Sequence, residues 1–122
     1  MTQNNELNEA LQAHTMWKIT LKSAIQMGSL KTPIEDLRND KLCDFGAWLY
    51  GVTITEQLKK SAHYRKILKL HATFHEKTAM VGHLAVTGKK AEAENMMALN
   101  GDFTLAANEL AKAMMAWSMV EK

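Results

Sequence analysis

The sequence predicts an all-α protein, an antiparallel four-helix bundle built from three long helices and one short helix. Three long segments repeat apolar residues every three or four positions, which is the period of a helix with one buried face. The 122 residues contain only six Gly and one Pro, so few helix breakers interrupt these segments. No alternating apolar and polar run is long enough to predict a strand. Short loops between successive helices favour antiparallel neighbours.

The first long helix is expected over residues 5–27, and Gly28-Ser29 ends its apolar pattern. Residues 29–40 contain Pro33 and the pair Asn39-Asp40, and we expect a loop there. The apolar stripe of the first helix consists of Leu7, Leu11, His14, Trp17, Leu21 and Ile25.

A short helix is expected within residues 42–51. Asn39 or Asp40 would be its N-cap, and Gly51 would end it. The residues expected to share one of its faces are Phe45, Trp48 and Leu49.

Two further long helices are expected over residues 54–86 and 89–118, with Thr87-Gly88 between them. Thr53 and Glu56 have the spacing of a capping box, and Asn100-Gly101 is expected to loosen a turn of the last helix. The inward residues predicted for 54–86 are Leu58, Ala62, Ile67 or Leu68, His71, Phe74, His75, Thr78, Gly82 and Ala85. Those predicted for 89–118 are Met96, Leu99, Phe103, Ala106, Leu110, Met114 and Trp117.

Composition and charge limit the classes of protein to consider. The chain is 47% hydrophobic with a net charge of +2, so we expect one folded domain over residues 1–122 and no dedicated nucleic-acid binder. A single Cys allows no internal disulfide and favours a reducing compartment. No cationic leader and no apolar run of membrane-spanning length occur, which favours a cytoplasmic location away from membranes.

Five histidines and one cysteine are the residues best suited to carry chemistry. His71 and His75 lie one helical turn apart, about 6 Å, on one face, which suits two ligands of one metal ion. His63 and His83 each lie about 12 Å further along the same helix and cannot join them. His14 and Cys43 would complete a tetrahedral zinc set from other elements. Each residue alone also fits an ordinary helical core, so spacing leaves both interpretations open.

Three motifs together resemble the signature of the CZB family, the chemoreceptor zinc-binding domains. They stand in the order of the family, carry all four ligand types and span about residues 10–80. Residues 101–110 also resemble the last helix of that family. The motifs are HTMW at 14–17, CDFGAWLYG at 43–51 and LHATFH at 70–75.

The resemblance implies a four-helix bundle that binds one zinc ion, Zn²⁺, per chain. The implied metal ligands are His14, Cys43, His71 and His75. It also implies aromatic walls around the ion from Trp17, Trp48 and Phe74, while Asp44 and Glu76 are weak candidates to orient the ligands.

The same resemblance implies a sensory or regulatory role and no enzymatic activity. Zinc with one thiolate and three neutral imidazoles has no open position, but it responds to zinc supply, acid and oxidants. Members of the family are attached to cytoplasmic chemoreceptors and diguanylate cyclases. A homodimer and a signalling partner in bacterial chemotaxis or second-messenger control are therefore implied.

Other functions remain to be weighed. A di-iron carboxylate bundle does not fit, because no Glu lies three residues before any His. The basic residues Lys59, Lys60, Arg65, Lys66 and Lys69 are interpreted as a solvated helix face. The main alternative is a helical partner-binding protein, either independent of metal or only stabilised by zinc. Its docking surface would use the surplus methionines of the last helix, Met96, Met97, Met114, Met115 and Met119.

Overall fold

The computed structural model describes residues 2–41, 43–51 and 54–120, and every regular element in these ranges is a helix. The predicted all-α class is confirmed, with three long helices and more short ones than expected. The helices are α1 (Thr2–Met27), α2 (Ile34–Arg38), α3 (Asp44–Leu49), α4 (Glu56–Lys59), α5 (Ala62–Val86), α6 (Lys90–Met97) and α7 (Asp102–Val120).

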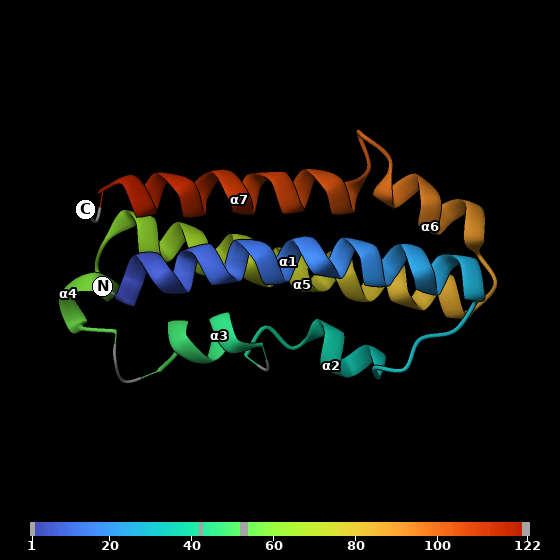
Figure 1. Cartoon of the computed structure of the whole chain (residues 1–122), viewed down its shortest axis with the longest axis horizontal. Coiled ribbons are helices and arrows are strands. Elements are labelled where there is room, and N and C mark those ends of the chain that lie inside the picture. Colours follow the sequence, from blue (N-terminus) through green and yellow to red (C-terminus); the bar gives the residue numbers. More distant parts are fainter. Residues whose placement is uncertain (1, 42, 52–53, 121–122) are drawn as a thin grey trace.

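The helices follow the up-and-down path of an antiparallel bundle (Figure 1). The helix α1 runs in one direction, α2 and α3 lead back, α5 runs alongside α1, and α6 and α7 return. The segment formed by α2 and α3 thus takes the place of the second helix of a four-helix bundle. The start of α1 and the end of α7 lie at the same end of the molecule (Figure 1).

Glycines end two of the long helices, as the sequence predicts. Gly28 follows α1 with a φ of 70°, and Gly88 follows α5 with a φ of 82°. Residues with a side chain rarely adopt this left-handed conformation. It lets the Gly28 N–H donate to the carbonyl of Ala24 (2.7 Å) and close the last turn.

The expected loop over residues 29–40 is wrong for Ile34–Arg38, which forms α2. Pro33 is its N-cap residue, with the extended backbone that starts a helix. Leu37 is 1% exposed and packs on α5 at Gly82, where its Cδ1 lies 2.9 Å from the position that a Cβ would take. Tertiary packing therefore stabilises a helix too short to show a period in the sequence.

The N-cap of α3 also differs from the expectation. Cys43, rather than Asn39 or Asp40, has the extended backbone of an N-cap, and its Sγ accepts a hydrogen bond from the Gly46 N–H (3.3 Å). The helix ends at Leu49, just ahead of the predicted stop at Gly51.

The helix expected over 54–86 is interrupted between α4 and α5. Thr53 of the predicted capping box lies outside the described residues. The Thr55 side chain caps α4 by accepting from Leu58 N–H (3.1 Å), and Ser61 caps α5 by accepting from Tyr64 N–H (3.1 Å). Two hydroxyl residues that favour helix starts thus divide the segment.

The last expected helix is likewise divided, between α6 and α7, at the Asn100-Gly101 pair. A Cβ at Gly101 would collide with the carbonyls of Asn95 and Met96, so only glycine fits this turn. Leu99 was expected to face inward, which is wrong: it is 85% exposed because it lies in the break.

The core lies between α1, α5 and α7, which bury their apolar faces against one another. Most of the predicted inward positions are confirmed; Ala62 and Leu99 are exposed instead, and the side chain of Leu7 lies outside what the structure describes. No helix in the described ranges has the length and apolar character needed to cross a membrane. The largest fully buried side chains include Trp117, Phe74, Phe103, Leu21, Ile67, Leu110, Met114 and His71.

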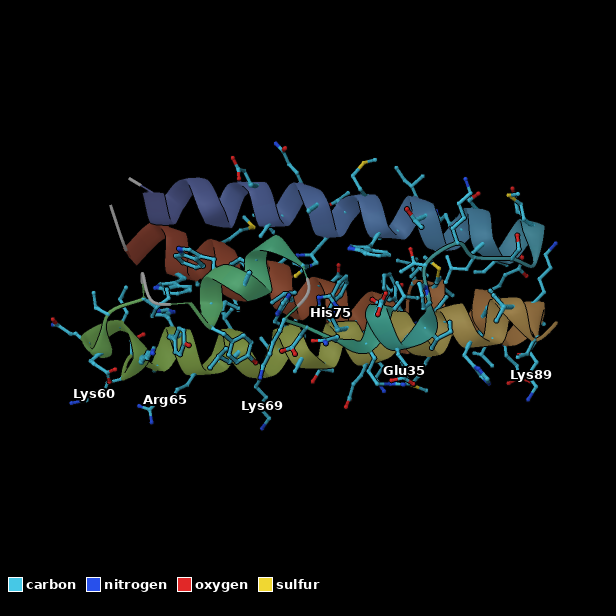
Figure 2. All side chains as sticks on the ribbon, turned by 90° about the horizontal axis from the view of Figure 1, so that it is seen from below. Glu35, Lys60, Arg65, Lys69, His75 and Lys89 are labelled. Carbon is cyan, nitrogen blue, oxygen red and sulfur yellow. The ribbon has the colours of Figure 1, made fainter. Side chains whose placement is uncertain are left out.

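The basic residues near the start of α5 point away from the core. Lys60, Arg65 and Lys69 project outward in Figure 2, and all three are exposed. In the same view, His75 points from α5 into the bundle.

Candidate metal centre

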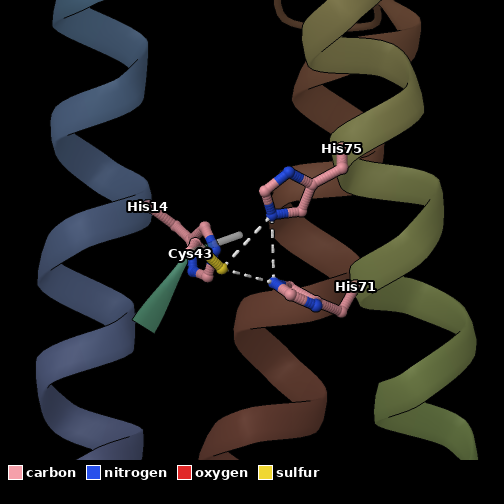
Figure 3. A group of neighbouring side chains, drawn as sticks. All are labelled: His14, Cys43, His71 and His75. Atoms are coloured by element: carbon pink, nitrogen blue, oxygen red, sulfur yellow. Dashed lines mark hydrogen bonds between the residues drawn. The ribbon is translucent and has the colours of Figure 1, made fainter. Parts of the chain in front are cut away.

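Three separate elements bring His14, Cys43, His71 and His75 together (Figure 3). His14 comes from the middle of α1, Cys43 from the start of α3, and the pair His71 and His75 from α5. Each residue offers one ligand atom, and these four atoms all lie within 4.8 Å of one another. His71 and His75 are buried, and the other two are partly buried.

Three of the four donor atoms form a compact triangle. The Cys43 Sγ lies 3.4 Å from His71 Nε2 and 3.5 Å from His75 Nε2, and the two Nε2 atoms are 3.1 Å apart. A tetrahedral zinc site places two imidazole nitrogens about 3.3 Å apart and a nitrogen and a sulfur about 3.6 Å apart. The triangle therefore has nearly the dimensions that one zinc ion requires.

The ring of His75 is oriented by the backbone of α2. Its Nδ1 donates a hydrogen bond to the carbonyl of Leu37 (2.9 Å), which leaves Nε2 to face Cys43. Such a bond fixes the tautomer that a metal needs. Of the two acids considered for this task, Glu76 is exposed, and the side chain of Asp44 lies outside what the structure describes. The backbone carbonyl of Leu37, which no sequence signal marks, performs the task instead.

The Cys43 sulfur is held by the turn that begins α3. The Gly46 N–H donates to Sγ (3.3 Å), and an N–H donor beside sulfur favours its thiolate form. A Cβ at Gly46 would collide with the carbonyl of Asp40, so this close turn requires glycine. Tyr50 fastens the same loop, because its hydroxyl donates to Asp40 Oδ2 (2.9 Å) and its pKa is raised to about 12 by burial and by that bond.

Burial keeps the three histidines neutral. It is the largest cause that lowers the pKa of His71 to about 2, with further lowering by the charges of His75 and His14. Burial and the charge of His75 lower the pKa of His14 to about 4. The nearby backbone of Ala10 raises this pKa, although the geometry between them is not that of a hydrogen bond. The pKa of His75 is lowered as well, again mainly by burial. Neutral imidazole is the form that binds metal ions.

Aromatic rings surround the cluster. Phe74 makes an edge contact with His14, with centroids 4.8 Å apart, and Phe45 does the same with His71 at 5.2 Å. Trp48 stacks on Phe45, one layer further out, and Trp17 lines a cavity beside His14 and Cys43. Phe74 thus fulfils the role predicted for it, and Phe45 is a wall that the motif-based prediction of the site did not include.

The other two histidines lie outside the cluster, as their spacing predicts. His63 is partly buried near the start of α5, and His83 is exposed near its end. Within the described ranges, the group of His14, Cys43, His71 and His75 is where metal-ligating side chains converge.

The donor set fits zinc. Zinc favours tetrahedral sites of imidazole nitrogen and thiolate sulfur, and a set of three His and one Cys provides both. In the described part of the chain, both ring nitrogens of His14 are buried without a hydrogen-bond partner. A buried polar atom without a partner lowers the stability of the fold, and a bound metal ion would provide a partner for one of the two nitrogens.

Comparison with known families gives one match. The family profile of the chemoreceptor zinc-binding domain (CZB) covers residues 14–81, which is more than half of the chain and includes all four clustered residues. Comparisons with curated proteins and with solved structures gave no match. The resemblance seen in the motifs is therefore confirmed, and the chain belongs to the CZB family of chemoreceptor zinc-binding domains.

Proposed function

We propose that this domain holds one zinc ion through His14, Cys43, His71 and His75 and works as a sensory or regulatory module. The observation that carries the proposal is the convergence of these four donor atoms within 4.8 Å, three of them at the spacings of a tetrahedral site. Membership of a zinc-binding sensory family supports the same function.

A regulatory role suits the donor set better than catalysis. Zinc would contribute a fixed positive centre of formal charge about +1 that ties the three ligand-bearing segments together. With all four positions filled by side chains, water has no place to be activated, as it is in catalytic zinc sites.

Three kinds of signal would change how these side chains hold the ion. Low zinc supply empties the site, acid protonates Cys43 and the imidazoles, and oxidants convert the thiolate to sulfenic acid. Because the donors come from α1, the start of α3 and α5, each change alters how these elements are held together. We propose that a partner detects this change.

The proposed partners are a second copy of the chain and a signalling protein of bacterial chemotaxis or second-messenger control in the cytoplasm, such as a chemoreceptor or a diguanylate cyclase. Exposed apolar side chains on α1 support association with some partner. Met16, Ile19 and Met27 are all more than half exposed, and apolar side chains gathered on one exposed surface are typical of an interaction site.

The exposed residues of α1 favour one alternative function more than the methionines expected to form its docking surface, since Met114 is buried, Met96 and Met97 are partly buried, and the Met119 side chain lies outside what the structure describes. A helical partner-binding domain would use the exposed apolar residues directly and would need zinc only to stabilise its fold, or not at all. The two functions differ in what removal of zinc does: a sensor stays folded without the ion, whereas a structural site does not.

The proposed function is tested by the metal content of the purified chain. Protein made without a His-tag or added metal is analysed for zinc by elemental analysis, together with the double variant His71→Ala/His75→Ala. We expect about one zinc per chain in the wild type and none in the variant. The control His83→Ala, on the same helix but outside the cluster, should keep its zinc. Stoichiometric zinc in the double variant would overturn the assignment of the ligands.

A further inference from the structure

Among the described residues, His14 makes fewer hydrogen bonds than the other three clustered residues. His75 is fixed by the Leu37 carbonyl, Cys43 by the Gly46 N–H, and His71 is fully buried in contact with both. Within the described ranges, both ring nitrogens of His14 lack a hydrogen-bond partner, whereas in His71 only Nδ1 lacks one. The three compact donor pairs are at most 3.5 Å apart, so the longest separations in the cluster, up to 4.8 Å, involve His14.

Two cavities flank the His14 ring. One of about 110 Å³ lies between α1 and α3 and also reaches Cys43, and one of about 90 Å³ lies between α1 and α7. The first is several times the volume of about 10–15 Å³ that one water molecule needs, so it has room for a small organic molecule. Two of the four clustered residues, His14 and Cys43, line it.

We propose that His14 is the displaceable ligand of this centre, and that the cavity between α1 and α3 admits a small neutral nitrogen-donor molecule to the position that His14 leaves. This inference depends on the proposed zinc site. It adds to that site a place where a solute can bind, next to Cys43.

The walls of the cavity define the class of molecule. Ala10, Ala13, Trp17 and Phe45 give it apolar sides, and the exposed acidic residue Glu9 also lines it. Negative charge in the lining disfavours anions, and apolar sides disfavour strongly hydrated ions. A neutral ring of imidazole size fits both the space and the polarity, and it replaces one neutral donor by another without a change of charge.

The inference is tested on the full chain loaded with cobalt(II), whose visible absorption reports the ligands directly. The variant His14→Ala should still bind cobalt through its three remaining ligands, with an altered spectrum. Added imidazole should then restore the wild-type spectrum in a saturable way. Failure of His14→Ala to bind cobalt, or a spectrum that imidazole does not change, would overturn the inference.

Two further substitutions identify the entrance. Ala13→Leu in the His14→Ala background narrows the cavity between α1 and α3 and should weaken imidazole binding about tenfold or more. The matched substitution Ala111→Leu fills the cavity on the other side of His14 and should leave imidazole binding unchanged. Weaker imidazole binding with Ala111→Leu, and unchanged binding with Ala13→Leu, would overturn the assignment of the cavity. The wild-type cobalt spectrum should also change with imidazole, less than that of His14→Ala, because His14 must first leave the metal. Since His14→Ala can fail to fold, Ala13→Leu is also tested alone, where it should suppress this wild-type change.

The preference for a neutral molecule is tested with azide, a small anion that also binds metal ions through nitrogen. Azide should restore the spectrum of His14→Ala less well than imidazole, and Glu9→Gln should reduce the difference. An equal response to the two probes would contradict the preference for neutral molecules. Absence of cobalt uptake by the wild type itself would instead defeat the proposed function, so the two failures are distinguishable.

Discussion

Cys43 serves both as the N-cap of α3 and as a member of the metal cluster, and these roles can be separated by substitution. In the metal-free protein, Cys43→Ala should lower the free energy of unfolding by about 1 kcal/mol, because the Gly46 N–H loses its acceptor. Cys43→Ser keeps an acceptor and should unfold close to the wild type, while both variants bind zinc more weakly. Urea unfolding of the chelator-treated proteins measures the difference, and equal stability of the two variants would exclude the capping role.

Tyr64 joins the start of α5 to the end of α3. Its hydroxyl donates to the buried carbonyl of Leu49 (2.7 Å), and burial raises its pKa. Tyr64→Phe should cost about 1–3 kcal/mol of unfolding free energy, because the carbonyl is left without a partner. Tyr50→Phe breaks a bond of similar length at an exposed site and should cost less. Thermal or urea unfolding tests the pair, and an equal loss in both would contradict this account.

The four clustered residues differ in how far the sequence predicts them as metal ligands. His71 and His75 follow from helical spacing, whereas His14 and Cys43 become specific only through the family motifs. The Leu37 carbonyl was not predictable, since a backbone acceptor has no signature in the sequence. The capping role of Cys43 was missed because Ser, Thr, Asp and Asn are the usual caps.

At the scale of whole elements, periodicity predicts the long helices but not their interruptions. The apolar repeat continues across the breaks before α5 and before α7, so the pattern alone extends each helix too far. Local features mark these breaks: the caps Thr55 and Ser61, and the turn at Gly101. The five residues of α2 are too few to show a period, and packing against α5 stabilises them.

The packing of α2 on α5 sets the position of the Leu37 carbonyl, so a change at the contact should reach the metal site. Gly82→Leu places a side chain where Leu37, Ile34 and Leu30 now pack, and it should displace α2. The loss of the His75 partner should weaken zinc binding about 10- to 100-fold.

Competition with a chelating dye measures this change in zinc affinity. The control His83→Leu adds a similar side chain at the next, exposed position of α5 and should leave affinity unchanged. Unchanged affinity in Gly82→Leu would show that α2 does not position the ligand.

For the molecule as a whole, the buried histidines make the metal-free protein sensitive to acid. They stay neutral when folded but bind protons near pH 6.5 when unfolded, so stability is full above pH 6.5 and falls as the pH decreases below it. For His71 and His75 the slope approaches about 1.4 kcal/mol per pH unit each. For His71 the loss continues towards its folded pKa of about 2.

Urea unfolding of the chelator-treated protein between about pH 6.5 and about pH 5 measures this slope. At these pH values most carboxylates remain ionised and contribute little to it. The variant His71→Ala/His75→Ala lacks both groups and should show a shallower dependence on pH. The same slope in both proteins would mean that the two histidines are not buried as neutral groups.

The central claim is that one zinc ion is held reversibly by four side chains in a bundle that folds without it. The most direct measurement follows zinc content and helical circular dichroism in the same sample, before and after a strong chelator and again after zinc is restored. We predict about one zinc per chain, its complete removal with most of the helical signal retained, and its full return. A chain that takes up no zinc, or one whose helices are lost when zinc is removed, would contradict the claim.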